Sequence, residues 1–426
     1  MSTGQKIRFA GDVSIERVRI TTSKGFYLDV TAQTIAIQYY EDIFSPFISG
    51  SIILKESFDF TNLFPLIGEE YLDLEIITPT LDDQKAIRGT YYIYKMTDKE
   101  ALGDKSSAYQ LHFMSTEAIV DMNKKVSGVF GDRVSQLIRR FITDKTNGLE
   151  STKQVFIEET SNSTKYVSNF WSPAKNLIYL TNQATNLNNI PNYVFFENRD
   201  GFYFVSLDTL YTGNVYQEFT YDKYTRDSDG MGGDIKNVDA DYKRISNFSI
   251  PVHYDYIDKI SSGMLASKLI TYDVTTKKYT AKNYNMFSRF DKQKHLNKNA
   301  INTDSVPYRT GSNIMVLSKQ WGNFNGFGDV TNTRFIQERV STLKAAESSK
   351  LHITVPGRTD YTVGQKMAIY LNRMEPISSK KEDTLDRALS GYYILAAVNH
   401  YIDREKHECH MELIRESSQM DMNTGK

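Results

Sequence analysis

Two stretches, 68–76 (GEEYLDLEI) and 364–371 (GQKMAIYL), decide the fold of this chain. The first is followed by 89–94 (GTYYIY) and 109–113 (YQLHF), and the second by 391–395 (GYYIL) and 409–413 (CHMEL). Apolar Leu72, Leu74 and Ile76 alternate with acidic residues, which predicts a half-buried strand. The shared order of strand, glycine-led strand, polar turn and strand predicts a duplicated β-meander, with chance similarity as the alternative. A true duplication would give one chain two similar barrels and three chains six similar units in a ring.

The composition indicates a globular, β-rich protein of more than one domain. The 426 residues are 40% hydrophobic and include 28 Tyr and 23 Phe, which favours strands packed on strands over disorder. The net charge of -1 supplies no global field that would hold a polyanion or an anionic membrane. Residues 1–6 are polar and no apolar run of ~20 residues follows, so we expect no export signal, no membrane insertion and assembly in a cytoplasm.

The middle of the chain predicts two helices and a hairpin. Asp132 is expected to cap a helix that buries Val134, Leu137, Ile138, Phe141 and Ile142. Ser172 and Pro173 begin a second helix, with Leu177, Leu180 and Ala184 directed inward. The hairpin follows at 193–206. A later helix around 333–346 is expected to bury Ile336, Val340 and Leu343.

The order of these segments resembles the baseplate central hub proteins of contractile-tailed bacteriophages, which are related to the hub part of type VI secretion spike proteins. One carrier is the aromatic-led helix 170–177 (FWSPAKNL) with its hairpin 193–204; the other is the closing series from 334 to 413. The resemblance implies two tube-like barrels per chain and a homotrimer with pseudo-sixfold symmetry beneath the tail tube. The expected fold class is therefore α+β, mainly β, with two similar antiparallel tube-type β-barrels and small α/β insertions.

The expected domains follow from this pattern. Residues 1–117 form the first tube-like barrel, and 118–233 form a helix and hairpin domain. Residues 234–274 and 333–416 form the second tube-like barrel, 275–332 an irregular inserted region, and 417–426 a flexible tail.

No catalytic, cofactor-binding or metal site is expected. The chain lacks G-x-S-x-G, H-E-x-x-H and the G-x-x-x-x-G-K-[ST] phosphate loop. Ser378 and Lys381 fit S-x-x-K, but their run, 378–383 (SSKKED), is typical of a solvated loop rather than of a desolvated nucleophile. The loop 227–234 (DSDGMGGD) lacks the late bidentate Glu of a calcium loop and is interpreted as a flexible turn.

The single cysteine excludes an intramolecular disulfide framework but raises the question of a metal. His407, Cys409 and His410 have the side chains of metal ligands, yet on a strand His410 points away from the other two. They are interpreted as ordinary strand residues. Between Lys277 and Lys298, seven Lys or Arg interleave with aromatics; we favour a solvated protein-docking face over a nucleic-acid surface and expect these lysines to lie outside the bore of the hub.

The resulting hypothesis is a non-enzymatic structural hub of a contractile phage tail. Its implied partners are two further copies of the chain, the tail spike protein, the tail tube protein and neighbouring baseplate proteins. Phage DNA is expected only as passing cargo during ejection, and the location is the virion baseplate, assembled in the host bacterial cytoplasm. The alternatives are the hub of a tailocin or type VI-like injection machine, and a tail-associated cell-wall hydrolase.

Overall fold

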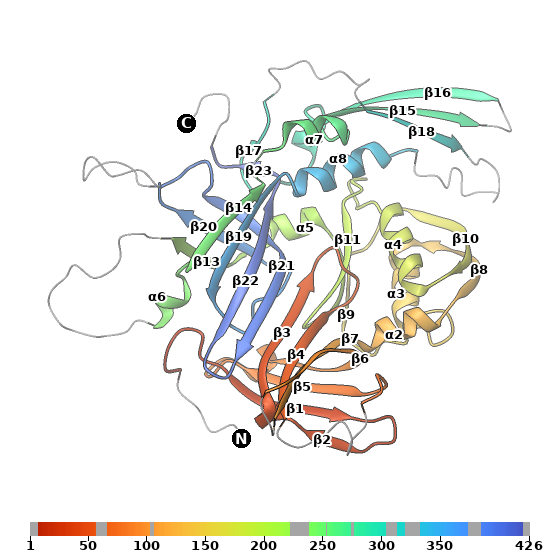
Figure 1. Ribbon diagram of the computed structural model, residues 1–426. Coiled ribbons are helices and arrows are strands. Elements are labelled where there is room, and N and C mark those ends of the chain that lie inside the picture. The colour runs from red at the N-terminus through yellow and green to blue at the C-terminus, as the bar shows by residue number, and fades with distance from the viewer. Residues whose placement is uncertain are drawn as a thin grey trace, which may run out of the picture.

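The computed structural model describes residues 7–56, 66–102, 106–221, 238–252, 254–273, 277–303, 313–319, 333–373 and 385–420. The molecule is mainly β, as expected, with helices gathered on one flank and beside the upper strands (Figure 1). None of the described helices is long and apolar enough to span a membrane.

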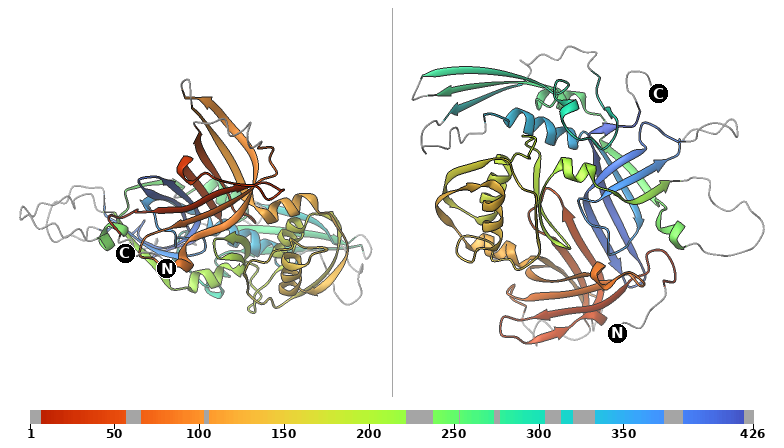
Figure 2. Two further views of the ribbon diagram at one scale, coloured as in Figure 1. Left: turned by 90° about the horizontal axis from the view of Figure 1, so that it is seen from below. Right: turned by 180° about the vertical axis from the view of Figure 1, so that it is seen from behind.

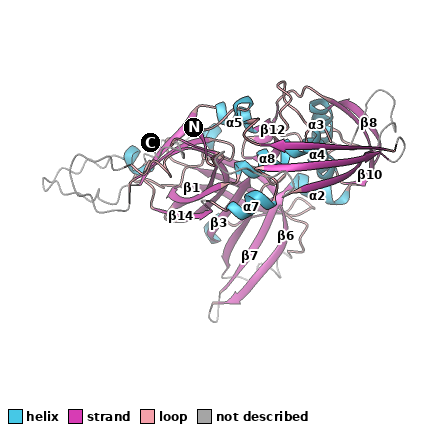
Figure 3. Ribbon diagram, turned by 90° about the horizontal axis from the view of Figure 1, so that it is seen from above, coloured by secondary structure: helices cyan, strands magenta, loops and turns pink. Residues whose placement is uncertain are grey.

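The first part of the chain is a β-meander with its own apolar core. Its strands are β1 (Ser14–Thr21), β2 (Tyr27–Asp29), β3 (Thr34–Asp42), β4 (Ser49–Glu56), β5 (Tyr71–Ile77), β6 (Ile87–Ala101) and β7 (Ser107–Ser115), with short 3₁₀ turns at Thr31–Gln33 and Asp83–Lys85. Alternate residues of β5, Leu72, Leu74 and Ile76, are buried, which confirms the period-2 reading of this strand. The ends of β6 and β7 stand out from the body of the molecule (Figures 2 and 3).

The helix and hairpin region follows and packs around a separate apolar cluster. Its elements are α2 (Thr116–Asn123), β8 (Val126–Arg133), α3 (Val134–Thr143), β9 (Val155–Ile157), β10 (Ser163–Trp171), α4 (Pro173–Gln183), β11 (Tyr193–Asn198), β12 (Gly201–Ser206) and α5 (Leu207–Thr212). The predicted inward faces of both helices are buried in this cluster. Ser172 caps α4 by accepting a hydrogen bond from the Lys175 amide at 3.3 Å. The predicted cap at Asp132 is wrong: Arg133 precedes α3 and no side chain caps it.

The second half of the chain contains another meander and an added sheet. The elements are β13 (Val215–Tyr221), α6 (Val238–Tyr242), β14 (Asn247–Val252), α7 (Tyr256–Ser261), β15 (Ala266–Asp273), β16 (Lys278–Asn285), β17 (Asn299–Ala300), β18 (Ile314–Lys319), α8 (Ile336–Ala346), β19 (Ser349–Pro356), β20 (Lys366–Leu371), β21 (Gly391–Asp403), β22 (His407–Arg415) and β23 (Ser417–Ser418), with a 3₁₀ turn at Phe290–Lys292.

The two meanders repeat the same strand order. In the first, neighbours run β3-β4-β7-β6-β5-β1, and in the second β14-β19-β22-β21-β20-β13. The corresponding strands are therefore β1 and β13, β3 and β14, β4 and β19, β5 and β20, β6 and β21, and β7 and β22. One orientation differs, because β1 is antiparallel to β5 whereas β13 is parallel to β20.

The two tube-type barrels expected from the sequence are not present as closed barrels in the described residues. Instead β3 pairs with β21, so both meanders belong to one open sheet of 13 strands. The long strand β21 makes this possible: residues near Gly391 pair with β20, and residues from Ala397 onward pair with β3 on the same side.

Two expected irregular segments are partly ordered. Within 275–332, β16 and β18 flank β15 in a three-stranded sheet, which the sequence did not reveal because nearly every side chain of β16 is exposed. In the expected flexible tail, Ser417 and Ser418 are buried and pair with Ala300 and Asn299. The helix α8 also differs from its prediction, since it buries Gln337 and Arg339 while Ile336 and Val340 are only half-buried.

Candidate functional site

The junction between the two meanders is centred on the buried carboxylate of Glu41 in β3. Its oxygens accept hydrogen bonds from the Arg199 amide at 2.7 Å, the Thr362 hydroxyl at 2.6 Å and the Val363 amide at 3.1 Å. Burial raises the pKa of Glu41 to about 7, against the opposing effect of these donors. One side chain therefore ties the first meander to the hairpin β11–β12 and to the loop before β20.

The Arg199 guanidinium extends the same junction. Its Nη1 donates to the carbonyl oxygens of Lys85 at 2.8 Å and Thr359 at 2.5 Å. The Thr359 amide in turn donates to the Thr78 hydroxyl at 3.0 Å. The hairpin tip thus fastens two loops that are far apart in sequence, which is the arrangement of a structural joint.

A buried ion-pair network ties the helix region to the first meander. Lys153 Nζ lies 2.6 Å from carboxylate oxygens of both Glu117 and Glu197. Glu197 also accepts from the Ile48 amide at 3.1 Å and the Ser115 hydroxyl at 2.5 Å. Burial raises the pKa of Glu197, whereas for Glu117 the effect of burial is outweighed by Lys153 and the pKa is lowered.

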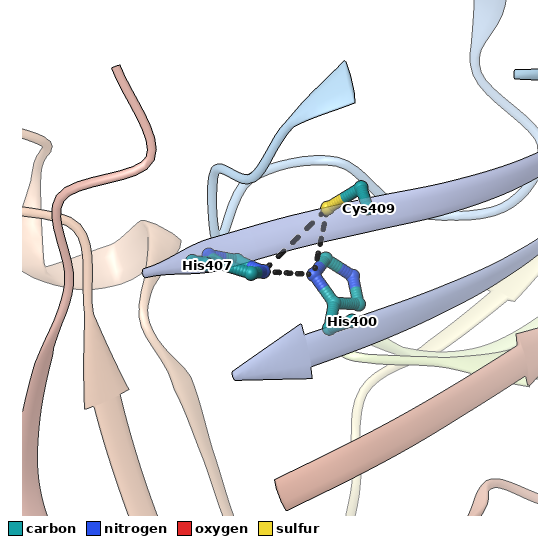
Figure 4. Close-up of side chains that lie close together, drawn as sticks. All are labelled: His400, His407 and Cys409. Atoms are coloured by element: carbon teal, nitrogen blue, oxygen red, sulfur yellow. Dashed lines mark hydrogen bonds between the residues drawn. The ribbon is translucent and has the colours of Figure 1, made fainter. Parts of the chain in front are cut away.

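The histidine and cysteine residues singled out in the sequence lie on β22, and the structure separates them as predicted. Figure 4 shows His407 and Cys409 on one face, with the ring of His400 from the neighbouring strand β21 close to both. His410 is exposed on the opposite face, where Nδ1 lies 3.2 Å from the Thr354 hydroxyl. His400 was missed because only the register of the β21–β22 hairpin places it opposite Cys409.

The groups of this buried cluster are close together. His400 Nδ1 lies 3.0 Å from His407 Nε2 and 3.3 Å from Cys409 Sγ, and His407 Nε2 lies 3.5 Å from Cys409 Sγ. Burial lowers the pKa of His400 to about 4 and lowers that of His407 as well, and it raises the pKa of Cys409.

The other candidate motifs give a mixed picture. Ser378, Lys381 and the loop 227–234 lie outside the described residues. All six lysines between Lys277 and Lys298 are exposed, but the segment is anchored by buried Tyr284, Met286 and Leu296. The interpretation of this stretch as a solvated docking face stays a prediction.

The face of the joined sheet carries an open groove of about 420 Å³. Its lining includes Tyr40 and Asp42 of β3, Phe248 of β14 and Glu412 of β22. Glu412 is already engaged, since it lies 3.0 Å from both Lys350 Nζ and His352 Nε2. The groove thus lies on strands from both meanders, and its Glu412 carboxylate is already engaged within the chain.

Comparisons with known proteins place this fold. No family model and no curated protein matches the sequence. The tail protein from Neisseria meningitidis MC58 superposes with a TM-score of 0.56 at 12% identity, covering 94% of this chain and 96% of that one. The 43 kDa tail protein of prophage MuSo2 from Shewanella oneidensis gives 0.54 at 7% identity, covering 94% and 98%. The chain has the fold of these tail proteins, so the resemblance drawn from the sequence is confirmed at the level of fold.

Proposed function

We propose that this chain is a non-enzymatic structural hub of a contractile tail baseplate. Three copies form a pseudo-sixfold ring that joins the tail tube to the central spike and leaves a channel for DNA. The observation that carries this proposal is the pairing of β21 with β3, because the same pairing can recur between chains.

The correspondence of the two meanders extends to single residues. Gly89 pairs with Leu74 at the start of β6, and Gly391 pairs with Ile369 at the start of β21. Four residues after the glycine in each strand, Ile93 pairs with Phe113 and Leu395 pairs with Leu413. A register shift follows directly in both strands, so β6 and β21 bend at the same place.

In the described chain, two strand edges whose counterparts pair with each other are left unpaired: one in β6 and one in β14. From Ala397 onward, β21 has β22 on one side and β3 on the other. The corresponding part of β6, from Lys95 onward, has only β7. The strand that corresponds to β3 is β14, and it pairs only with β19. A neighbouring chain's β14 therefore fits beside β6 in the way that β3 fits beside β21.

The exposure of corresponding side chains supports the same arrangement. Tyr94 and Met96 of β6 are 42% and 39% exposed, whereas their counterparts Ala396 and Val398 of β21 are 1% and 2% exposed. Coverage by a neighbour's β14 removes this apolar surface from water. The contact between β3 and β21 within each chain then alternates with the contact between β14 and β6 of neighbouring chains, and together they close a ring of six units from three chains.

The register of β3 on β21 gives the test. Tyr40 pairs with Ser49 and Val252 pairs with the corresponding Lys350, so Val252 of β14 is the counterpart of Tyr40. Tyr40 pairs with Asn399 of β21, and the same register sets Thr97 of one chain opposite Val252 of the next. We expect a variant with both Thr97→Cys and Val252→Cys to form disulfide-linked trimers under mild oxidation, since cross-strand pairs lie ~4.5–5.5 Å apart. The product is resolved by non-reducing electrophoresis and light scattering.

Matched controls separate this contact from random oxidation. Each single cysteine variant should give no closed trimer, and neither should Val215→Cys with Thr97→Cys, because exposed Val215 lies on a different edge strand, β13. A wild-type protein that stays monomeric at micromolar concentration with its spike protein present would contradict the proposal. Turnover of peptidoglycan by the purified protein would instead favour a hydrolase.

A further inference from the structure

The cluster of His400, His407 and Cys409 is unusual because three potential metal ligands converge in the protein interior. The residues are 1%, 1% and 0% exposed. Their ligand atoms all lie within 4.8 Å of one another. Buried polar groups usually have hydrogen-bond partners, and these three find most of theirs in one another, so their convergence requires an explanation.

The strand register brings them together. Cys409 is paired with His400, so their side chains lie on the same side of the hairpin, and His407 shares that side because it precedes Cys409 by two residues. The hairpin end is itself fixed, since the His407 amide donates to the Gly11 carbonyl at 2.9 Å and its carbonyl accepts from the Gly357 amide at 2.7 Å. The three ligands thus lie on two paired strands whose end is fixed by backbone hydrogen bonds.

The hydrogen bonds around the cluster leave the converging atoms available. His400 Nε2 lies 3.0 Å from the Tyr361 carbonyl oxygen, which can only accept, so Nε2 carries the proton and Nδ1 has a free lone pair. Such a bond from the outer nitrogen to a carbonyl is the usual support of a metal-bound histidine. His407 Nε2 lies 3.0 Å from this Nδ1 atom and can donate to its lone pair in the metal-free cluster. His407 Nδ1 has no partner, so on metal binding the proton can move to Nδ1 and Nε2 can present a lone pair as well.

The spacing matches tetrahedral coordination. Metal bonds of about 2.0–2.1 Å to nitrogen and 2.3 Å to sulfur place two tetrahedral nitrogens ~3.3 Å apart and nitrogen and sulfur ~3.6 Å apart. The observed separations are 3.0 Å for the nitrogens and 3.3 and 3.5 Å for nitrogen to sulfur. Small outward shifts of the side chains therefore accommodate an ion.

We propose that His400, His407 and Cys409 bind a thiophilic transition-metal ion, Zn²⁺ or Cu⁺, which closes the end of the β21–β22 hairpin. One thiolate and two imidazoles are the ligand set that these ions prefer. On binding, the Cys409 S–H bond breaks, the proton passes to solvent and a metal–sulfur bond forms. Because the site is fully buried, the ion enters as the chain folds.

The test uses the full chain refolded with Zn²⁺, with Cu⁺ under anaerobic reductant, or with Co²⁺ as a spectroscopic probe. We expect elemental mass spectrometry to find ~1 metal ion per chain. The Co²⁺ form should show a near-ultraviolet sulfur-to-Co²⁺ charge-transfer band. Competition between the two metals decides which is preferred. His410→Ala is the matched control, since this histidine neighbours the site in sequence but lies on the opposite face.

Cys409→Ser should abolish the Co²⁺ charge-transfer band, and His407→Ala should reduce metal content at least about tenfold. The variants are checked for folding by circular dichroism, and the wild-type spectrum stands as evidence even where a variant does not fold. A folded wild-type chain that takes up none of the three metals overturns the proposal. So does a Co²⁺ spectrum without a sulfur band, or one that His410→Ala removes. None of these outcomes bears on trimer formation, which the cysteine cross-link tests separately.

Discussion

Glu41→Gln should change how the stability of this protein depends on pH. The carboxyl is 2% exposed and its pKa is raised to about 7 by burial, against an ordinary value of 4.5. Between these values the folded chain holds a proton that the unfolded chain has released. The stabilisation is therefore fully present below pH 4.5 and is lost as the pH rises through 7.

The magnitude follows from the two pKa values. Each unit between them corresponds to about 1.4 kcal/mol, so the wild-type protein loses about 3 kcal/mol through this one group, most of it between about pH 5 and pH 7. Glutamine does not titrate, so the variant lacks this loss. It has a separate, pH-independent penalty of about 1–3 kcal/mol, because its amide nitrogen cannot accept from one of the donors that face Glu41.

The measurement is the urea midpoint of wild type and Glu41→Gln across this pH range at one protein concentration. The difference in stability should shift in favour of the variant by about 3 kcal/mol as the pH rises. Exposed Glu405→Gln serves as the matched control and should follow the wild type at every pH. Parallel curves for wild type and Glu41→Gln, within about 0.5 kcal/mol, would refute the reasoning.

Two further substitutions test the helix region. Lys153→Met should lower stability by about 2–3 kcal/mol in urea unfolding, because two buried carboxylates lose their cation; exposed Lys125→Met is its control, and an equal effect of both would contradict a network role. Phe141→Ala should lower it by about 3–5 kcal/mol, since the ring is fully buried. Met122→Ala, 62% exposed, should change it by less than about 0.5 kcal/mol, and the packing account fails if the two match.

Elements whose burial follows a simple period were predictable from the sequence. All five predicted inward residues of α3 are buried, and α4 begins at the predicted Ser172 and Pro173. In such elements the apolar face meets a single apolar core, so hydrophobicity alone reports the orientation.

The helix α8 shows where this logic fails. Arg339 is buried because its guanidinium donates to the Pro191 carbonyl at 3.2 Å and the Tyr193 carbonyl at 3.1 Å. Gln337 is buried because its amide donates to the Ser267 carbonyl at 3.1 Å. These partners lie far away in sequence, so a helix with a polar buried face cannot be recognised by periodicity.

The candidate sites had the same limitation. The sequence correctly placed His410 away from His407 and Cys409, because the period of a strand is local. His400 enters through the pairing of two strands, which depends on the turn between Ile402 and His407. Glu41 is likewise recognisable as a junction residue only when Thr362 and Arg199 are brought to it by the fold.

The strands β21 and β6 bend at corresponding positions but differ in their neighbours. The residues of β21 after Leu395 have β22 on one edge and β3 on the other, and the register shift at Ala396 turns the strand from β20 toward β3. In β6 the shift occurs at the corresponding Tyr94, yet no strand of the described chain takes the place of β3. A bend that is repeated where no described strand uses it is hard to explain by the described part of one chain alone. It is explained if the external edge has the same kind of partner as the internal one, supplied by the next copy.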